Sequence, residues 1–350
     1  MISIIVLAHN KVELTRRCLE AVCRSRLPHD WELLCVDNGS TESLEGLADD
    51  FGSRPIAFQM PHNSENLSFS QANNRAALAA RGQQLVFLNN DVIVSEDALS
   101  HLIEALEGET DAGVAGGKLL YRDTGLVQHA GIAQMLWGYA SNFGVGAAPD
   151  HPVARKRREM FAVTGAMMAV DRSVFELIGG FDENYRWGYE DLDICLKARY
   201  LGRRVLYIPE AVGSHDESAT LKQARIAVQD ETNYRWFRNV WEPWLAPPEI
   251  EYLDGLHGQE IRRVVIFGTG RAAEGLFRVL TDQGISVAAF AWTRTDQAGS
   301  YYCALPVVPL DALPRMEFDR LMVGSQYYFQ LQPLLSRFDP QGDPLFPVLW

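Results

Sequence analysis

Residues 2–8 read ISIIVLA and run directly into His9-Asn10, and this pattern indicates the fold class. A short apolar run of this kind is typical of a strand buried on both faces of a parallel sheet. We predict a helix from Val12 to Ser25 and a second strand from Glu32 to Val36, which ends in the polar residues 37–40. Strands that alternate with helices and end in polar residues indicate an α/β protein whose sheet has one functional edge.

A further buried strand is predicted from Leu85 to Leu88, and it ends in Asn89-Asn90-Asp91. Open α/β sheets bind their ligands at the carboxyl ends of the strands. Amide and carboxylate oxygens suit Mg²⁺ or Mn²⁺ held against a diphosphate. The alternative is a simple turn, because Asn and Asp dominate turns.

Residues 181–200, FDENYRWGYEDLDICLKARY, place three acids beside a turn and at the start of a predicted helix. Acids at a helix start are favourable because the free N–H groups there carry partial positive charge, so capping is one interpretation. The other is catalysis, with Tyr185 and Trp187 shielding a ring-shaped substrate while a carboxylate takes a proton. The two aromatic side chains favour catalysis.

Four segments together resemble the inverting family 2 glycosyltransferases of the GT-A fold, in particular the rhamnosyltransferase-like group that builds bacterial surface polysaccharides. The segments are SIIVLAHNKVELTRRCLEAV, VDNGSTE, NLSFSQANNRAALAARGQQLVFLNNDV and VTGAMMAVDRSVFELIGGFDENYRWGYEDLDICLKAR. They stand in the expected order and cover roughly residues 1–240. The resemblance implies an α/β fold with a GT-A nucleotide-sugar-binding mixed sheet and flanking helices.

The resemblance also implies which residues bind the donor. Asp37 would hold the pyrimidine base of a nucleotide-sugar. The other implied donor-binding residues are Ala8, His9, Asn10, Asn66, Asn73, Asn89 and Asn90. Ser68 and Gln71 replace glycines that are usual in the family, so we expect an altered loop there. Gln128 or His129 would also face the donor.

By the same resemblance, residues 89–91 replace the Asp-x-Asp metal motif of the family, and only the last acid is kept. Asp91 would therefore bind Mg²⁺ or Mn²⁺ together with His215, which stands where the family often supplies a histidine to the metal or diphosphate. A lone histidine is more often a packed or surface residue, and that alternative stays open.

Inverting transfer is an in-line displacement that needs a base, a counter-charge for the leaving diphosphate and aligned reactants. We assign Asp191 as the base and Glu190 as the residue that orients it or the acceptor. Asp193 lies two residues further on, so it points elsewhere on a helix and is interpreted as a first-turn acid. Trp187, Gly165 and Ala166 are assigned to the acceptor, although simple strand packing also explains the two small residues.

Composition limits the partners. The net charge of −13 and a pI of about 5.1 argue against nucleic acid. The basic cluster at residues 155–158 is either a solvated face or a patch for acidic lipid-linked acceptors and membrane phosphates. Five cysteines without paired spacing and the lack of a long apolar run indicate a protein of the cytoplasm or of the inner face of the membrane. Nothing in the sequence indicates the oligomeric state.

Four segments are expected: a GT-A domain at residues 1–242, a linker at 243–260, a Rossmann-like α/β domain at 261–340 and a tail at 341–350. Gly268, Gly270 and Ala273 fit the G-x-G-x-x-G/A pattern between a strand and a helix. The acid that would hold an adenine ribose is missing, although Arg294 could meet a 2′-phosphate. Tight packing alone also explains these glycines.

The sequence therefore predicts an enzyme that transfers a sugar with inversion from a dTDP- or UDP-sugar to a saccharide or lipid-linked acceptor, in surface polysaccharide or glycoconjugate synthesis. One alternative is an NAD(P)-dependent sugar-modifying enzyme built on the C-terminal unit. The other is a non-catalytic scaffold for glycan assembly.

Overall fold

The computed structural model describes residues 1–135, 140–216, 225–245, 261–293, 299–325, 327–345 and 348–349. The chain forms two compact units, one of residues 1–131 and 148–245 and the other of residues 132–147 and 246–350. The segment 132–147 thus belongs to the second unit, whereas the sequence-based boundaries had it in the first domain. Among the described helices, none is long and apolar enough to cross a membrane.

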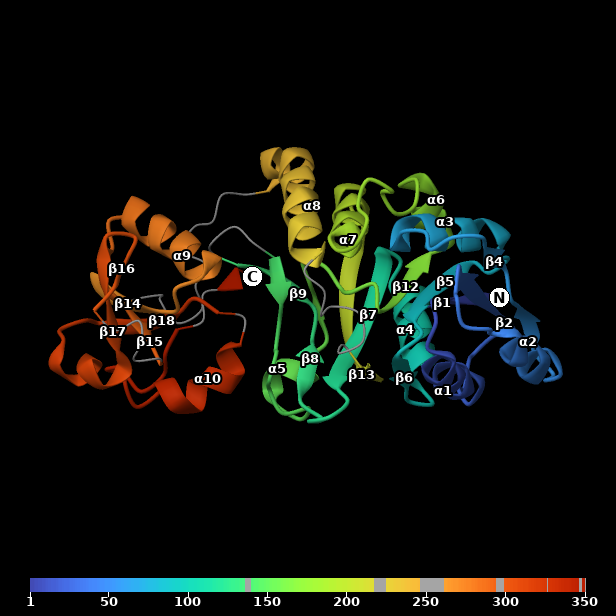
Figure 1. The fold of residues 1–350 in the computed structure, drawn as a ribbon, viewed down its shortest axis with the longest axis horizontal. Coiled ribbons are helices and arrows are strands. Elements are labelled where there is room, and N and C mark those ends of the chain that lie inside the picture. Colours follow the sequence, from blue (N-terminus) through green and yellow to red (C-terminus); the bar gives the residue numbers. More distant parts are fainter. Residues whose placement is uncertain are drawn as a thin grey trace. The chain divides into compact units, whose positions relative to one another are not determined.

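The first unit is built on a mixed sheet of eleven described strands with the central order β11-β13-β7-β12-β5-β1-β2-β3 (Figure 1). Its strands are β1 (Ile2–Ala8), β2 (Trp31–Asn38), β3 (Ala57–Gln59), β4 (His62–Asn63), β5 (Gln84–Asn89), β6 (Val92–Val94), β7 (Ala112–Tyr121), β8 (Val127–His129), β11 (Arg158–Glu159), β12 (Met167–Asp171) and β13 (Arg204–His215). Its helices are α1 (Val12–Cys23), α2 (Glu45–Gly52), α3 (Phe69–Ala79), α4 (Ala98–Gly108), α5 (Pro152–Arg155), α6 (Arg172–Leu177), α7 (Glu190–Tyr200) and α8 (Arg225–Trp241), and the short 3₁₀ helix η2 (Glu242–Trp244) follows α8.

The three strands predicted from the apolar runs lie side by side and parallel, with β1 between β2 and β5. Strand β12 runs antiparallel to both β5 and β7, and β13 runs parallel to β7. Strands β1, β2, β5, β7 and β13 therefore all end at one edge of the sheet, and β12 begins there. We call this edge the carboxyl edge; it is the edge at which the sequence analysis expected the functional residues.

Helices cover both faces of the sheet (Figure 1). On one face α1, α2 and α4 share a single apolar core with alternate residues of β1, β2 and β5. On the other face four phenylalanines, Phe69, Phe87, Phe175 and Phe181, pack edge-on or tilted with ring centroids 4.9 to 5.7 Å apart. Burial on both faces explains why these strands are almost uninterrupted apolar runs.

The second unit holds a five-stranded sheet with the order β16-β17-β15-β14-β18. Its elements are β14 (Arg263–Phe267), α9 (Arg271–Asp282), β15 (Ser286–Trp292), β16 (Tyr301–Tyr302), β17 (Leu305–Pro309), η5 (Leu310–Arg315), β18 (Arg320–Val323) and α10 (Tyr328–Leu335). Strands β14, β15, β17 and β18 are parallel. The unit also contains the small sheet of β9 (Ile132–Met135), β10 (Ala140–Asn142) and β19 (Val348–Leu349). The residues assigned to a tail therefore take part in pairing, because β19 adds to β9 and Leu345 bridges to β18.

Candidate active site

The end of β1 is joined to the loop after β2 through His9 and Asn10. His9 Nδ1 donates to the carbonyl of Asn38 at 3.0 Å, and Asn10 N donates to Ser40 Oγ at 2.9 Å. Asn10 has a left-handed backbone with φ of 56°, and its Oδ1 accepts from Thr41 N and Glu42 N. These two side chains therefore shape the loop around Asp37. The Ala8 side chain is buried in the core, so its backbone is the part that can face this loop.

Asp37 lies next to this loop, and both of its carboxylate oxygens have partners. Oδ1 accepts from Ser40 N at 3.0 Å, and Oδ2 lies 2.9 Å from His62 Nδ1. Partial burial raises the pKa of Asp37, but the contacts with Ser40 and His62 outweigh it and leave the pKa below its ordinary value. Asp37 is therefore an ionised acceptor at neutral pH. His62 was missed by the sequence analysis, because a histidine in a two-residue strand gives no local signal.

The asparagines assigned to the donor have different surroundings. Asn66 Oδ1 accepts from the buried Asn38, which also bonds to Leu67 and Asn63, so this loop is fixed to the end of β2. Asn73 is buried and donates to the Phe69 carbonyl within α3. Asn90 donates to Thr15 of α1 at 2.8 Å. Ser68 and Gln71, which replace the glycines usual in the family, form a capping box at the start of α3.

Asp91 and His215 meet at the carboxyl edge. Strand β13 ends at His215, whose Nε2 lies 3.2 Å from Asp91 Oδ1. His215 Nδ1 lies 2.8 Å from Gln128 Oε1, and an amide oxygen can only accept, so Nδ1 carries the proton. In the neutral ring Nε2 then has a lone pair directed at Asp91.

The surroundings of Asp91 fit a cation. Its Oδ1 atom is buried, and among the described residues no group donates a hydrogen bond to it. A carboxylate oxygen that faces the lone pair of a neutral imidazole nitrogen is suited to share a cation with it. No set of three or more His, Cys, Asp or Glu side chains with metal-ligand geometry occurs in the described part of the chain. The remaining ligands would therefore come from a diphosphate and water, as is usual for Mg²⁺.

Glu190 and Asp191 begin α7, as predicted, immediately after a strained turn. Gly188 and Tyr189 have φ of 88° and 74°, and a left-handed tyrosine is uncommon. Glu190 is buried, whereas Asp191 is partly exposed, so Asp191 is the accessible carboxylate of the pair. Burial raises the pKa of both groups, and the neighbouring Asp191 charge adds to the rise for Glu190, whose pKa is about 8.

The predicted acceptor residues Gly165 and Ala166 connect Asp191 with the end of β5. Gly165 N donates to Asp191 Oδ2 at 3.2 Å, and Asn89 N donates to the Ala166 carbonyl at 3.0 Å. A Cβ atom on Gly165 would come within 3.1 Å of the Phe69 ring, so only glycine fits here without displacement. His129 accepts from Thr164 N, which supports the same loop. The base candidate and the metal candidate are thus joined through one short loop.

Of the two aromatic residues expected to shield a substrate, only Trp187 is exposed, with 44% of its surface accessible. Tyr185 is fully buried, so the interpretation of Tyr185 as a substrate-stacking residue is wrong. Asp193 is in the first turn, as predicted, but it is not a solvent-facing acid. It is buried and bonds to Lys197 Nζ at 2.8 Å and Trp241 Nε1 at 2.9 Å, which makes it an anchor for α8.

Part of the basic cluster at residues 155–158 already has partners within the structure. Arg157 pairs with Glu109, which also pairs with Arg204. Arg158 donates to the carbonyl of Val153. These contacts favour the solvated-face interpretation of the cluster. The guanidinium of Arg157, which a phosphate patch would need for binding, is already paired with Glu109.

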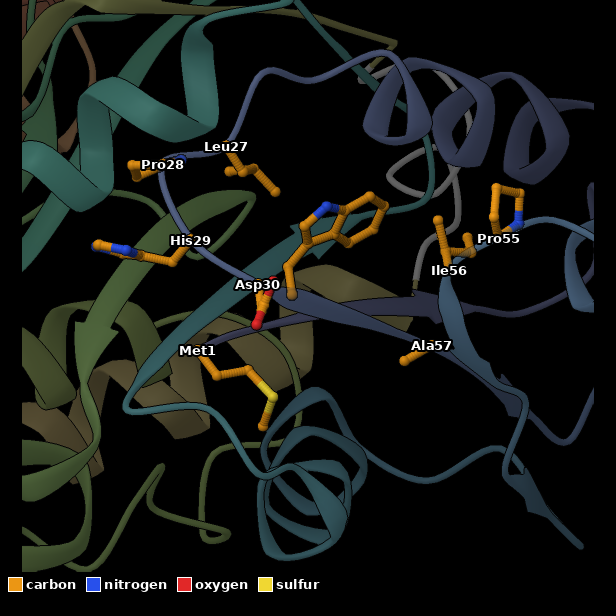
Figure 2. Close-up of a pocket in the computed structure, with 9 residues that line it drawn as sticks. Met1, Leu27, Pro28, His29, Asp30, Pro55, Ile56 and Ala57 are labelled. Atoms are coloured by element: carbon orange, nitrogen blue, oxygen red, sulfur yellow. The ribbon is translucent and has the colours of Figure 1, made fainter.

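A cavity of about 580 Å³ lies away from all these residues (Figure 2). Its walls include Met1, Trp31 and Ala57, which stand at the starts of β1, β2 and β3. It therefore opens at the amino ends of the parallel strands, the edge opposite to Asp37, Asp91 and Asp191.

Comparisons with known proteins show which families the sequence matches. The family model described as Glycosyl transferase family 2 matches residues 3–179, a model of the N-terminal domain of galactosyltransferase matches 152–216, and the model described as C2185-like, N-terminal, matches 260–338. The O-antigen biosynthesis protein RfbC of Myxococcus xanthus is 30% identical over 261 residues, which are 72% of this chain and 20% of the relative. The uncharacterized protein y4gI of Sinorhizobium fredii is 30% identical over 228 residues, 63% of this chain and 25% of the relative.

The chain thus spans a quarter or less of the length of these two relatives. It spans more of the O-antigen chain rhamnosyltransferase WbaN of Salmonella anatum, at 24% identity over 197 residues, 55% of this chain and 58% of the relative.

Two solved structures share the fold. GalNAc-T7 with UDP, GalNAc and Mn²⁺ has a TM-score of 0.58 at 17% identity and covers 82% of this chain and 55% of its own. The mannosyltransferase PcManGT of Pyrobaculum calidifontis with GDP-Man and Mn²⁺ has a TM-score of 0.52 at 19% identity and covers 71% of this chain and 66% of its own. Their shared fold agrees with the mixed GT-A sheet expected from the sequence. Since the family 2 model spans just over half of the 350 residues, the chain belongs to glycosyl transferase family 2.

Proposed function

We propose that the chain transfers a sugar, with inversion at the anomeric carbon, from a pyrimidine nucleotide-sugar to a saccharide or lipid-linked acceptor in surface polysaccharide synthesis. One observation supports this above all: the Asp91–His215 pair and the partly exposed Asp191 share the carboxyl edge. They are linked through the loop of Gly165 and Ala166. Two of the relatives named above act in O-antigen synthesis, which supports the choice of product.

The donor would extend from Asp37 to Asp91. Asp37 is ionised and can accept from the N–H of a pyrimidine ring, and the loop held by His9 and Asn10 would border the base and ribose. Asp91 and His215 would hold a divalent cation, whose chemistry there is to offset the negative charge of the leaving diphosphate. Gln128 keeps the His215 Nε2 lone pair directed at this position.

Asp191 would remove the proton of the acceptor hydroxyl during the displacement. Its Oδ2 accepts a backbone bond from Gly165 N at 3.2 Å, and the side chain of Thr164 also hydrogen-bonds to the carboxylate, which leaves the partly exposed carboxylate oriented at the edge for the acceptor. Burial raises the pKa of Asp191 above its ordinary value, and a higher pKa makes a carboxylate a stronger general base. The exposed indole of Trp187, four residues before Asp191, would pack against a sugar ring of the acceptor.

A thermal-shift screen tests the donor site. UDP or dTDP should raise the melting temperature in Mn²⁺ or Mg²⁺ and much less in EDTA, because the diphosphate completes a site that has only two protein ligands. ADP under the same conditions is the control for base recognition at Asp37. Equal shifts in EDTA and in metal would contradict a cation site at Asp91, and equal shifts with ADP would contradict pyrimidine recognition.

The Glu190–Asp191 pair predicts opposite pH dependences of rate and stability. The rate should rise with pH as the coupled pair loses its protons, because the base must be ionised. A carboxyl whose pKa is raised on folding stabilises the fold at low pH, and this contribution is lost as pH rises toward the folded value. For Glu190 that window runs from its ordinary value of 4.5 to about 8. Melting temperatures of the wild type and of Glu190→Gln are measured over this window. The wild type should lose stability as the pH rises, and Glu190→Gln should lose less.

The second unit is proposed to be Rossmann-like, since β17-β15-β14-β18 is a parallel sheet in the order 3-2-1-4. Gly268 has φ of 119°, and a Cβ atom on it would lie 3.2 Å from the Gly324 carbonyl oxygen, so backbone conformation and close packing account for Gly268. A Cβ atom on Gly270 would have no neighbour within 4 Å, so packing does not explain that glycine. Arg294, the residue considered for a 2′-phosphate, lies outside the described residues.

Reduction or oxidation of saccharides with NADPH or NADP⁺ would support the oxidoreductase alternative. Failure to cleave any nucleotide-sugar would support the scaffold.

A further inference from the structure

Helix α8 bonds to residues 182–193, the segment that carries the proposed base, at three points. Trp236 Nε1 donates to Asp182 Oδ2 at 3.2 Å near the start of the segment. Trp241 Nε1 donates to Asp193 Oδ1 at 2.9 Å at its end. Asn233 bonds to the middle of the segment, directly before Glu190 and Asp191.

Asn233 is buried, with 1% of its surface accessible. Its Nδ2 donates to the carbonyls of Trp187, at 2.7 Å, and Gly188, at 3.0 Å. Both partners are acceptors, so the amide nitrogen and not the amide oxygen must face them. One NH₂ group thus supplies both donors, and the isosteric aspartate would place a carboxylate oxygen against two carbonyls.

The two carbonyls belong to a strained backbone turn. Gly188 and Tyr189 are both left-handed, and Tyr189 precedes α7 without a side-chain cap. The Tyr189 ring packs against Tyr234 and Phe237 of α8 at centroid distances of 6.1 and 5.4 Å. Strained non-glycine residues persist only where their surroundings hold them, and here α8 provides those surroundings.

We propose that Asn233 is a positioning residue of the transfer reaction. By fixing the carbonyls of Trp187 and Gly188, it sets the direction of the Trp187 side chain and the start of α7, and so holds Asp191 against Gly165. Asn233 touches no reacting atom and acts through the turn. This inference rests on the proposed function, because Trp187 and Asp191 matter only if the site transfers a sugar.

The test compares Asn233→Asp and Asn233→Ser with the wild type and with Trp236→Phe. Trp236→Phe is the matched control, because it removes another bond from α8 to the same segment and leaves the turn untouched. Release of UDP or dTDP from UDP-glucose or dTDP-rhamnose in Mn²⁺ is followed with aryl-glycoside acceptors. The melting temperature is measured with and without UDP and dTDP.

Both Asn233 variants should lose about 10- to 100-fold in kcat, raise the acceptor KM and shift the pH midpoint of kcat, since small misplacements of reacting groups have effects of this size. The UDP- or dTDP-induced rise in melting temperature should stay, because the donor site is on other loops. Trp236→Phe should keep kcat within about twofold. If Asn233→Asp does not fold, kcat, the acceptor KM and the pH midpoint of Asn233→Ser provide the test.

Folded Asn233 variants with wild-type kcat and acceptor KM would overturn the inference while the proposed function stands. A loss of the nucleotide-induced shift that parallels the loss of rate would also overturn it, because it would show a general structural defect. If the wild type itself releases no nucleotide from any donor, the proposed function fails and the inference falls with it.

Discussion

Asp191→Asn should lower the transfer rate by roughly 10²–10⁴-fold, the usual contribution of a general base. Asparagine keeps the size of the side chain, and its amide oxygen can still accept from Gly165 N, so the loop that joins Asp191 to β5 should stay in place. The variant cannot take up a proton at neutral pH. Steady-state rates of nucleotide release with a saturating acceptor measure the effect.

Two observations accompany this result if Asp191 is the base. The affinity for the donor, measured by calorimetry with UDP and Mn²⁺, should hardly change, because Asp37, Asp91 and His215 lie on other strand ends. Glu190→Gln should reduce the rate less, because Glu190 is buried and Asp191 is the accessible carboxylate of the pair. A near-normal rate in Asp191→Asn combined with an inactive Glu190→Gln would reverse the two roles. If neither variant lost activity, the pair would be structural.

Asp91→Asn is expected to have the second largest effect, a loss of roughly 10²–10³ in rate. Offsetting the charge of the leaving group contributes several kcal/mol, and each 1.36 kcal/mol corresponds to a factor of about ten. The variant should also lose the difference between melting temperatures in Mn²⁺ and in EDTA when UDP or dTDP is present. Direct titration of Mn²⁺ in the presence of UDP gives a readout that is independent of turnover.

Asp97→Asn is the control for this experiment, since it makes the same change of charge on a nearby segment. Asp97 is a partly exposed residue that pairs with the exposed Arg26, and surface ion pairs of this kind contribute little. Its metal dependence should therefore match that of the wild type. An Asp91→Asn variant that kept the metal-dependent stabilisation would show that the cation is bound elsewhere.

Local sequence patterns were enough to predict several elements of this protein. The apolar runs of β1, β2 and β5 and the polar residues after them predicted parallel strands with a common edge, because strands buried on both faces leave no alternation in the sequence. The acidic residues Glu190 and Asp191 likewise predicted the start of helix α7. The family motifs added Asp91 and His215 as a pair, and the structure brings them within 3.2 Å.

The tertiary structure alone decided the contacts between residues that are far apart in the chain. His62 lies beside Asp37, Gln128 orients His215, and Asn233 holds the turn before Asp191; each depends on the register or packing of two separate elements. Tyr185 is buried while Trp187 is exposed, although both stand in the same short segment. Local composition cannot distinguish such cases, because burial depends on the elements that pack over a residue and these come from distant sequence.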